Sequence, residues 1–252
     1  MLMPIPEGPQ PTHRTVRPRG GWTLLIPLKG GPHAKSRLGA SPELARAIAL
    51  DTLRAALDCT AVRGVRVVTS DVGLARSCVA LGAQVCPESV RGAGPSRAVL
   101  DGVRGMRDGR AGGGKRPVAV LLGDLPALRP EDLQGALAAT ADVLSAPGGR
   151  GATRVIVPDL EGTGTVLLAA SSPRHLSPAF GPDSAAAHVR AGAVPLLLDL
   201  PRLRRDVDTR EDLLQAIGWG VGPLTAERLR TESSRHSPGT GPGSRDGARP
   251  TP

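Results

Sequence analysis

The chain has 252 residues, enough to bury the core of one domain or a small pair, and aromatic residues make up only 1% of it. Its formal net charge is +9, but no basic run is interleaved with aromatic side chains, which argues against nucleic acid as a partner and favours an anionic small molecule. No apolar run reaches the ~20 residues of a membrane span and no signal peptide is recognisable, so we expect a cytoplasmic protein without a membrane partner. The three cysteines lack metal-ligand spacing, which is typical of buried thiols in a reducing compartment.

The first half of the chain alternates predicted strands with predicted helices. Ser41 followed by Pro42 indicates a helix start, with a capping hydroxyl before a proline at the first helical position. Apolar patterning predicts strands over 23–27, 65–70, 83–86 and 118–122, and helices over 42–57, 73–81, 95–107 and 130–145. This alternation predicts a parallel, doubly wound sheet whose ligands bind at the carboxyl ends of the strands.

In the second half of the chain the regular alternation of strands and helices is lost. Short strands are predicted over 155–157, 166–169 and 194–198, with irregular connections and a helix over 185–190. We therefore expect an α/β, Rossmann-like fold with a single domain over 21–230. It should contain a mostly parallel sheet flanked by helices, with added antiparallel strands in the second half. Residues 1–20 and 231–252 have the composition of disordered tails, and 108–116 and 146–152 are predicted surface insertions.

A cationic loop follows the first predicted strand. The chain contains only three lysines, and two of them, Lys29 and Lys35, lie in this Gly- and Pro-rich loop together with Arg37. A strand that runs into a flexible cationic loop and then a helix is how α/β proteins hold phosphate groups. Lysine supplies a mobile point charge and arginine a forked set of donors. A polyphosphate ligand is therefore the first hypothesis.

Two acidic segments are candidates for metal binding. Asp124 directly follows the predicted strand at 118–122, and magnesium takes few carboxylates besides phosphate and water. Asp206 and Asp208 are alternate residues, which an extended segment presents to the same side. Each segment has a structural alternative: Asp124 could accept backbone amides of a turn, and Asp208 or Thr209 could cap the next helix. Together they favour magnesium bridging two separated carboxylates, the usual arrangement for phosphoryl and nucleotidyl transfer.

Two loops in the second half are candidates for binding an anion. Residues 161–165 (EGTGT) are rich in glycine and offer backbone amides and threonine hydroxyls, although a plain hairpin turn is the alternative. Residues 180–184 (FGPDS) precede a predicted helix, which places Gly181 and Ser184 at its N-terminus, where Ser184 could instead be only a cap. The five histidines have no metal-ligand spacing, and we assign none of them a catalytic role.

The motifs PLK, AKSRL, GDLPAL, EGTGT, FGPDSAAAH and DVDT occur in this order over residues 22–225. This ordered set resembles the guanylyltransferase family of coenzyme F420 biosynthesis, whose members act on phosphoenolpyruvate or 2-phospho-L-lactate. The resemblance implies a nucleotidyltransferase fold, with GTP and one of these acids as substrates and Mg2+ as the cofactor. The chain departs from the family pattern at one position: Ser96 stands where an asparagine is usual in a GLNxA-like segment.

The resemblance also implies roles for the candidate residues. Two carboxylates would hold magnesium: Asp124 and Asp206. Three cations would grip the triphosphate: Lys29, Lys35 and Arg37. The carboxylate of the acid would be bound by Thr165, Gly181 and Ser184, and the product would be handed to a downstream F420 transferase. Two alternatives stay open: a nucleotidyltransferase of the same fold with another phosphorylated acceptor such as 3-phosphoglycerate, and a non-enzymatic basic binding protein.

Overall fold

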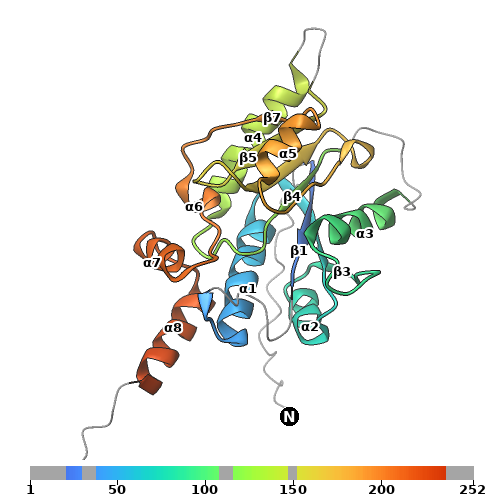
Figure 1. Ribbon diagram of the computed structural model, residues 1–252. Coiled ribbons are helices and arrows are strands. Elements are labelled where there is room, and N and C mark those ends of the chain that lie inside the picture. The colour runs from blue at the N-terminus through green and yellow to red at the C-terminus, as the bar shows by residue number, and fades with distance from the viewer. Residues whose placement is uncertain (1–20, 30–37, 108–115, 147–151, 237–252) are drawn as a thin grey trace, which may run out of the picture.

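A computed structural model describes residues 21–29, 38–107, 116–146 and 152–236. Within these residues the chain forms one seven-stranded sheet and eight α-helices (Figure 1). The strands are β1 (Trp22–Pro27), β2 (Val62–Val68), β3 (Gln84–Cys86), β4 (Val118–Leu121), β5 (Arg154–Pro158), β6 (Thr165–Ala170) and β7 (Val194–Pro195). The helices are α1 (Pro42–Asp58), α2 (Val72–Ala80), α3 (Pro95–Arg107), α4 (Pro130–Ser145), α5 (Ser184–Arg190), α6 (Pro201–Arg204), α7 (Arg210–Gly218) and α8 (Pro223–His236).

The strands lie in the order β3-β2-β1-β4-β6-β5-β7. β1 pairs in parallel with β2 on one side and with β4 on the other, so the winding reverses between β1 and β4. β6 is antiparallel to both β4 and β5, and β7 is parallel to β5. The expected Rossmann-like, mostly parallel sheet is confirmed. Its antiparallel character is confined to β6, because β5 and β7 run in the same direction as the first four strands.

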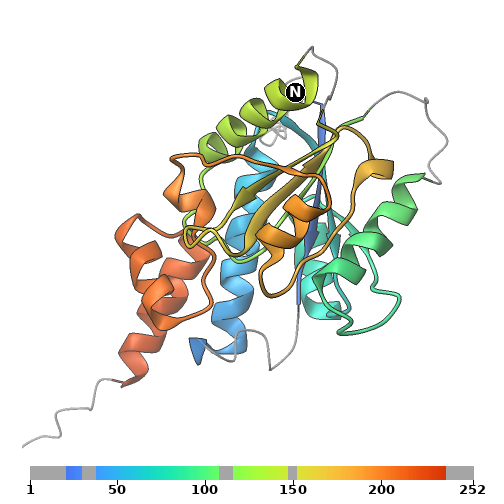
Figure 2. The same ribbon diagram turned by 45° about the horizontal axis from the view of Figure 1, so that its top comes forward.

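Helices cover both faces of the sheet (Figures 1 and 2). Side chains of β1 alternate between two core clusters: Leu24 and Ile26 pack with α1, α2 and α4, whereas Leu25 packs with α3 and α5. A strand buried on both faces needs apolar residues at every position, which explains why the strands stand out as continuous apolar runs. No helix in the described part of the chain is long and apolar enough to cross a membrane.

Local sequence signals fix the ends of several elements. The Ser41 hydroxyl accepts the backbone N–H of Leu44 at 3.0 Å and caps α1 as expected. α4 begins at Pro130 and ends at Ser145, as predicted. β7 is shorter than the predicted strand 194–198: it ends at Pro195, although the N–H of Leu196 still donates to the Ile156 carbonyl at 2.8 Å. The two predicted insertions lie mostly outside the described residues.

The last helix extends beyond the expected start of the C-terminal tail at residue 231, because α8 continues to His236. Its first turn is capped from α1: the buried Asp51 carboxylate accepts the backbone N–H of Leu224 at 3.2 Å and of Thr225 at 2.7 Å. Its last turns are also tied down, since Glu232 bonds with both Arg228 and Ser41. These tertiary contacts hold a polar segment helical, which composition alone did not indicate.

Candidate active site

Three neighbouring strands bring predicted site residues to one edge of the sheet. Lys29 lies two residues past the end of β1, and Asp124 lies three residues past the end of β4, its parallel neighbour. Thr165 is the first residue of β6, which is antiparallel to β4 and therefore begins at the same edge. The site thus lies where the winding of the sheet reverses, the usual position of ligands in open α/β sheets.

The turn that carries Asp124 is held by two close contacts. A Cβ atom on Gly123 would lie 2.0 Å from Cδ2 of the buried Leu28, so only glycine lets this turn approach the end of β1 so closely. On the other side, the backbone N–H of Leu125 donates to the Thr52 hydroxyl of α1 at 3.0 Å. The Asp124 carboxylate is half-buried, with its Oδ1 atom shielded from solvent.

Asp206 is brought beside Asp124 by the backbone. The N–H of Val207 donates to the Asp124 carbonyl at 3.0 Å, although the two segments are far apart in the sequence. Asp206 is half-buried, whereas Asp208 is exposed and its N–H donates to the Asp212 carboxylate at 3.2 Å. The geometry therefore favours Asp206 over Asp208 as the second carboxylate of this site.

The neighbouring Arg205 fixes this segment. Its buried guanidinium contacts Glu161 at 2.7 Å and Asp212 at 2.9 Å, and so links the segment to the 161–165 loop and to α7. Thr209 caps α7, and Asp212 completes the capping box. Burial raises the pKa of Asp212, but the hydrogen bonds from Thr209 and Asp208 and the charge of Arg205 together hold that pKa below its ordinary value.

The donor set at this edge fits magnesium. Within the described residues no group of three or more His, Cys, Asp or Glu side chains is arranged to hold a metal. Asp124 and Asp206 lie on segments that are joined by the backbone bond from Val207 to the Asp124 carbonyl. Mg2+ is usually held by one or two carboxylates, with substrate phosphates and water as its other ligands. The pair therefore suits a magnesium ion that arrives with a polyphosphate.

The 161–165 loop is organised by Asp159. Its buried carboxylate accepts the N–H of Thr163 at 2.9 Å and of Gly164 at 2.7 Å. A Cβ atom on Gly164 would lie 2.3 Å from Asp159 Oδ2, so glycine is required at this position. These two amides bond within the loop and are not presented to a ligand, which differs from what the glycine content suggested. The buried hydroxyl of Thr165 is a side-chain group of this loop that the Asp159 carboxylate does not engage.

The start of α5, at Ser184, lies beside the 161–165 loop. The backbone N–H of Ala185 in α5 donates to the Thr163 carbonyl at 3.0 Å, which joins the start of this helix to the loop. Ser184 is buried and is the first residue of α5, so it is not the cap; Asp183 occupies that position with a φ of 52°. Gly181 is exposed and lies two residues before Asp183.

The loop before α5 is also anchored to α3. The Ser96 hydroxyl accepts the N–H of Phe180 at 2.7 Å and donates to the Phe180 carbonyl at 3.2 Å. Ser96 thus forms a two-point connection between the start of α3 and the segment that carries Gly181. The position that departs from the family pattern therefore contacts the predicted acid-binding loop.

Sequence reasoning missed His188. This histidine is 1% exposed and its ring contacts the Thr165 hydroxyl at 3.0 Å and the N–H of Ala179 at 2.9 Å. One signal was available: His188 lies four residues after Ser184, which places both on the same face of α5. Lys29 is exposed next to the site. Lys35 and Arg37 lie outside the described residues.

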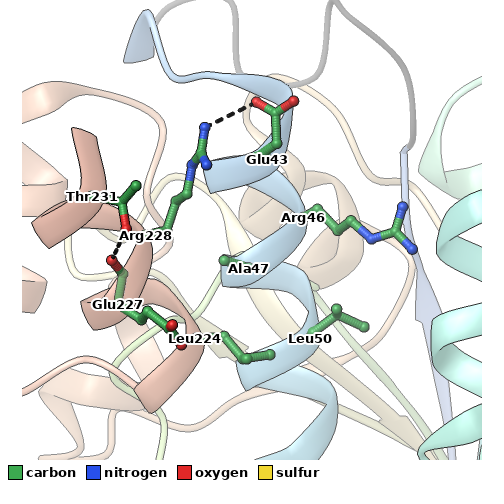
Figure 3. Close-up of a pocket in the computed structure, with 8 residues that line it drawn as sticks. All are labelled: Glu43, Arg46, Ala47, Leu50, Leu224, Glu227, Arg228 and Thr231. Carbon is green, nitrogen blue, oxygen red and sulfur yellow. Dashed lines mark hydrogen bonds and ion pairs between the residues drawn. The ribbon is translucent and has the colours of Figure 1, made fainter. Parts of the chain in front are cut away.

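A separate surface cavity of about 290 Å³ lies between α1 and α8 (Figure 3). It is lined from both helices by Glu43, Arg46, Ala47, Leu50, Leu224, Glu227, Arg228 and Thr231. The Arg228–Glu43 ion pair crosses it at 3.3 Å. None of the described candidate site residues lines this cavity, which is therefore separate from the candidate site at the edge of the sheet.

Comparison with solved structures defines the class of this fold. A nucleotidyl transferase from Methanothermobacter thermautotroptrophicus superposes with a TM-score of 0.56 at 18% identity, and the match covers 83% of this chain and 98% of that one. The fold is that of the Rossmann-like nucleotidyltransferases. No protein-family model matches the chain.

Curated relatives identify the family. The chain is 46% identical over 215 residues to the phosphoenolpyruvate guanylyltransferase of Streptomyces scabiei, with 81% of this chain and 94% of the relative covered. It is also 46% identical over 211 residues to the phosphoenolpyruvate guanylyltransferase of Salinispora arenicola, covering 81% and 92%. The chain belongs to the phosphoenolpyruvate guanylyltransferase family.

Proposed function

We propose that the protein transfers the guanylyl group of GTP to phosphoenolpyruvate, giving enolpyruvoyl-diphosphoguanosine and pyrophosphate. A phosphate oxygen of the acid attacks the α-phosphorus of GTP, and the bond from that phosphorus to the bridging oxygen of the β-phosphate breaks. The observation that carries the proposal is the family membership; it is supported by the position of Lys29, Asp124 and Thr165, which follow or begin three adjacent strands at one edge of the sheet. In coenzyme F420 biosynthesis the product would pass to a downstream transferase.

The attacking phosphate is already an anion, so the protein needs little acid–base chemistry. Catalysis then depends on in-line positioning and on neutralising charge. Asp124 and Asp206 would hold Mg2+, which neutralises phosphate charge when bound and lets the two anions approach. Lys29, together with Lys35 and Arg37, would stabilise the charge that develops on the leaving pyrophosphate.

The acid would be held at the other end of the site. Thr165 and Ser184 lie on the loop and the helix that are joined by the Ala185–Thr163 backbone bond, and Gly181 lies in the segment just before that helix. Thr165 and Ser184 are 2% and 3% exposed, so a carboxylate that reached their hydroxyls would meet groups already removed from water. 2-Phospholactate and 3-phosphoglycerate also carry a carboxylate near a phosphate, and they are therefore the acids to compare.

The test is pyrophosphate release by the purified protein with magnesium. GTP, ATP and CTP would each be combined with phosphoenolpyruvate, 2-phospholactate or 3-phosphoglycerate. The downstream transferase and its deazaflavin acceptor should be present to remove an unstable product. Turnover with GTP and phosphoenolpyruvate supports the proposal. Pyrophosphate release with GTP and a different acid, but not with phosphoenolpyruvate, would support a guanylyltransferase with that other acid as its substrate. No pyrophosphate release with any combination of nucleotide and acid would refute the proposed function.

A further inference from the structure

His188 connects three parts of the proposed acid site. Its ring is 1% exposed and lies 3.0 Å, through Nδ1, from the Thr165 hydroxyl at the start of β6. Its Nε2 lies 2.9 Å from the N–H of Ala179, in the loop that leads to Gly181. The ring also packs edge-to-face on Phe180, with centroids 5.0 Å apart. A buried histidine with two defined polar contacts has a defined tautomer.

The contact with Ala179 fixes that tautomer. A backbone N–H can only donate, so Nε2 must accept and carries no proton. In a neutral ring the proton then lies on Nδ1. Burial lowers the pKa of His188, the charge of Arg154 lowers it further, and a backbone hydrogen bond with Ser184 opposes them; the net shift is downward, so the ring is neutral at pH 7.

A proton on Nδ1 determines the direction of the Thr165 hydroxyl. Because Nδ1 carries the proton, the Thr165 hydroxyl cannot donate to it and can only accept from the ring, so the hydroxyl hydrogen is turned elsewhere. No acceptor for this hydrogen is found within the described residues, although Thr165 is 2% exposed. A buried donor without an acceptor costs roughly 1–3 kcal/mol, which an anionic ligand would recover.

We infer that His188 is a positioning residue that makes the Thr165 hydroxyl a donor to the carboxylate of the bound acid. With the opposite tautomer, Thr165 would donate to Nδ1 and turn its lone pairs toward a negatively charged ligand. The inference rests on the proposed function, since it takes the carboxylate acid as the ligand at Thr165. It assigns a role in substrate selection to a side chain that does not itself contact the substrate.

Two substitutions separate this role from simple packing. His188→Asn keeps a donor near the position of Nδ1 but leaves the Ala179 N–H without its acceptor. His188→Gln keeps an acceptor near the position of Nε2 but loses the donor to Thr165. We expect His188→Gln to raise the KM for the acid about tenfold with little change in kcat, and His188→Asn to raise it by much less. Thermal melting should show the opposite order, with Asn the less stable variant because it loses more contact with Phe180.

A double-mutant cycle tests whether His188 acts through Thr165. Thr165→Val alone should raise the KM for the acid, and adding His188→Gln should raise it no further. Additive effects would overturn the inference, as would equal KM values for the Asn and Gln variants. These outcomes require wild-type turnover. Absence of turnover with every acid would instead count against the proposed function.

The tautomer can be measured without any activity. The 15N shifts of the His188 ring, assigned by comparison with His188→Gln, should show a neutral ring with protonated Nδ1 and unprotonated Nε2. A neutral ring protonated on Nε2 would overturn the inference without any kinetic measurement.

Discussion

Two buried threonines should respond in opposite directions to the same substitution. The Thr52 hydroxyl accepts the N–H of Leu125, next to Asp124, at 3.0 Å and donates to the Ile48 carbonyl at 3.0 Å. Thr140 of α4 is also 0% exposed, but its hydroxyl has no hydrogen-bond partner in the described part of the chain. Valine has nearly the shape of threonine, so Thr→Val isolates the hydroxyl at each site.

Thr52→Val leaves the buried Leu125 N–H without an acceptor, which costs about 2 kcal/mol of unfolding free energy. For a chain of this size that lowers Tm by roughly 4 to 8 °C. Thr140→Val removes a buried, unpaired hydroxyl and should raise the unfolding free energy by about 1 kcal/mol. Urea unfolding of both variants measures the difference. Equal losses of stability in the two variants would refute the hydrogen-bond reasoning.

The Thr52→Val and Thr140→Val variants also test whether the Thr52–Leu125 hydrogen bond affects catalysis. Thr52 holds the turn that carries Asp124, so Thr52→Val should also lower kcat, whereas Thr140→Val should not. Assays well below the Tm of each variant separate this effect from unfolding. Unchanged kcat in Thr52→Val would mean that the Asp124 turn does not depend on this bond.

Three other predictions concern the loops and the pH dependence of stability. Ser96→Ala removes both bonds to Phe180 and should raise the KM for the acid several-fold, as steady-state kinetics would show; an unchanged KM would contradict the connection. Asp159→Asn loses one of two charge-assisted backbone bonds and should cost about 2 kcal/mol in urea unfolding, against little change for the exposed control Asp142→Asn. The pKa of Asp212 is lower in the folded chain than in the unfolded one, so its stabilisation is complete above about pH 4 and is lost as pH falls through the folded pKa. Asp212→Asn should therefore flatten the decrease in unfolding free energy as pH falls below about 4, and an unchanged slope would contradict this.

Much of the fold could be predicted because its signals are local. Strands such as β1 and β4 are buried on both faces and stand out as apolar runs, and α1 and α4 begin at prolines that fix their first turns. α8 could not be predicted in this way. It is polar, and it is held by the Asp51 carboxylate and by Ser41, both contributed by a distant part of the chain.

In the candidate site too, some features have local sequence signals and others depend on tertiary contacts. The positions of Asp124 and Thr165 at one edge of the sheet could be predicted, because Asp124 follows a recognisable strand and Thr165 begins one. The bond between Val207 and the Asp124 carbonyl, which favours Asp206, is tertiary and left no local signal. The Asp159 carboxylate accepts two loop amides because Asp159 directly follows β5, and the glycine-rich sequence of the loop did not indicate these bonds. The role of His188 depends on which atom each ring nitrogen contacts, and a sequence does not contain that information.

The most direct test of the account is the rate of pyrophosphate release from GTP and phosphoenolpyruvate by wild type, Asp124→Asn and the control Asp142→Asn, with magnesium and the downstream transferase present. The account predicts turnover by wild type and by Asp142→Asn, and a decrease of about 100-fold or more in Asp124→Asn, with all three chains equally folded by circular dichroism. Near-normal turnover by Asp124→Asn would contradict the site proposed at the carboxyl ends of β1 and β4.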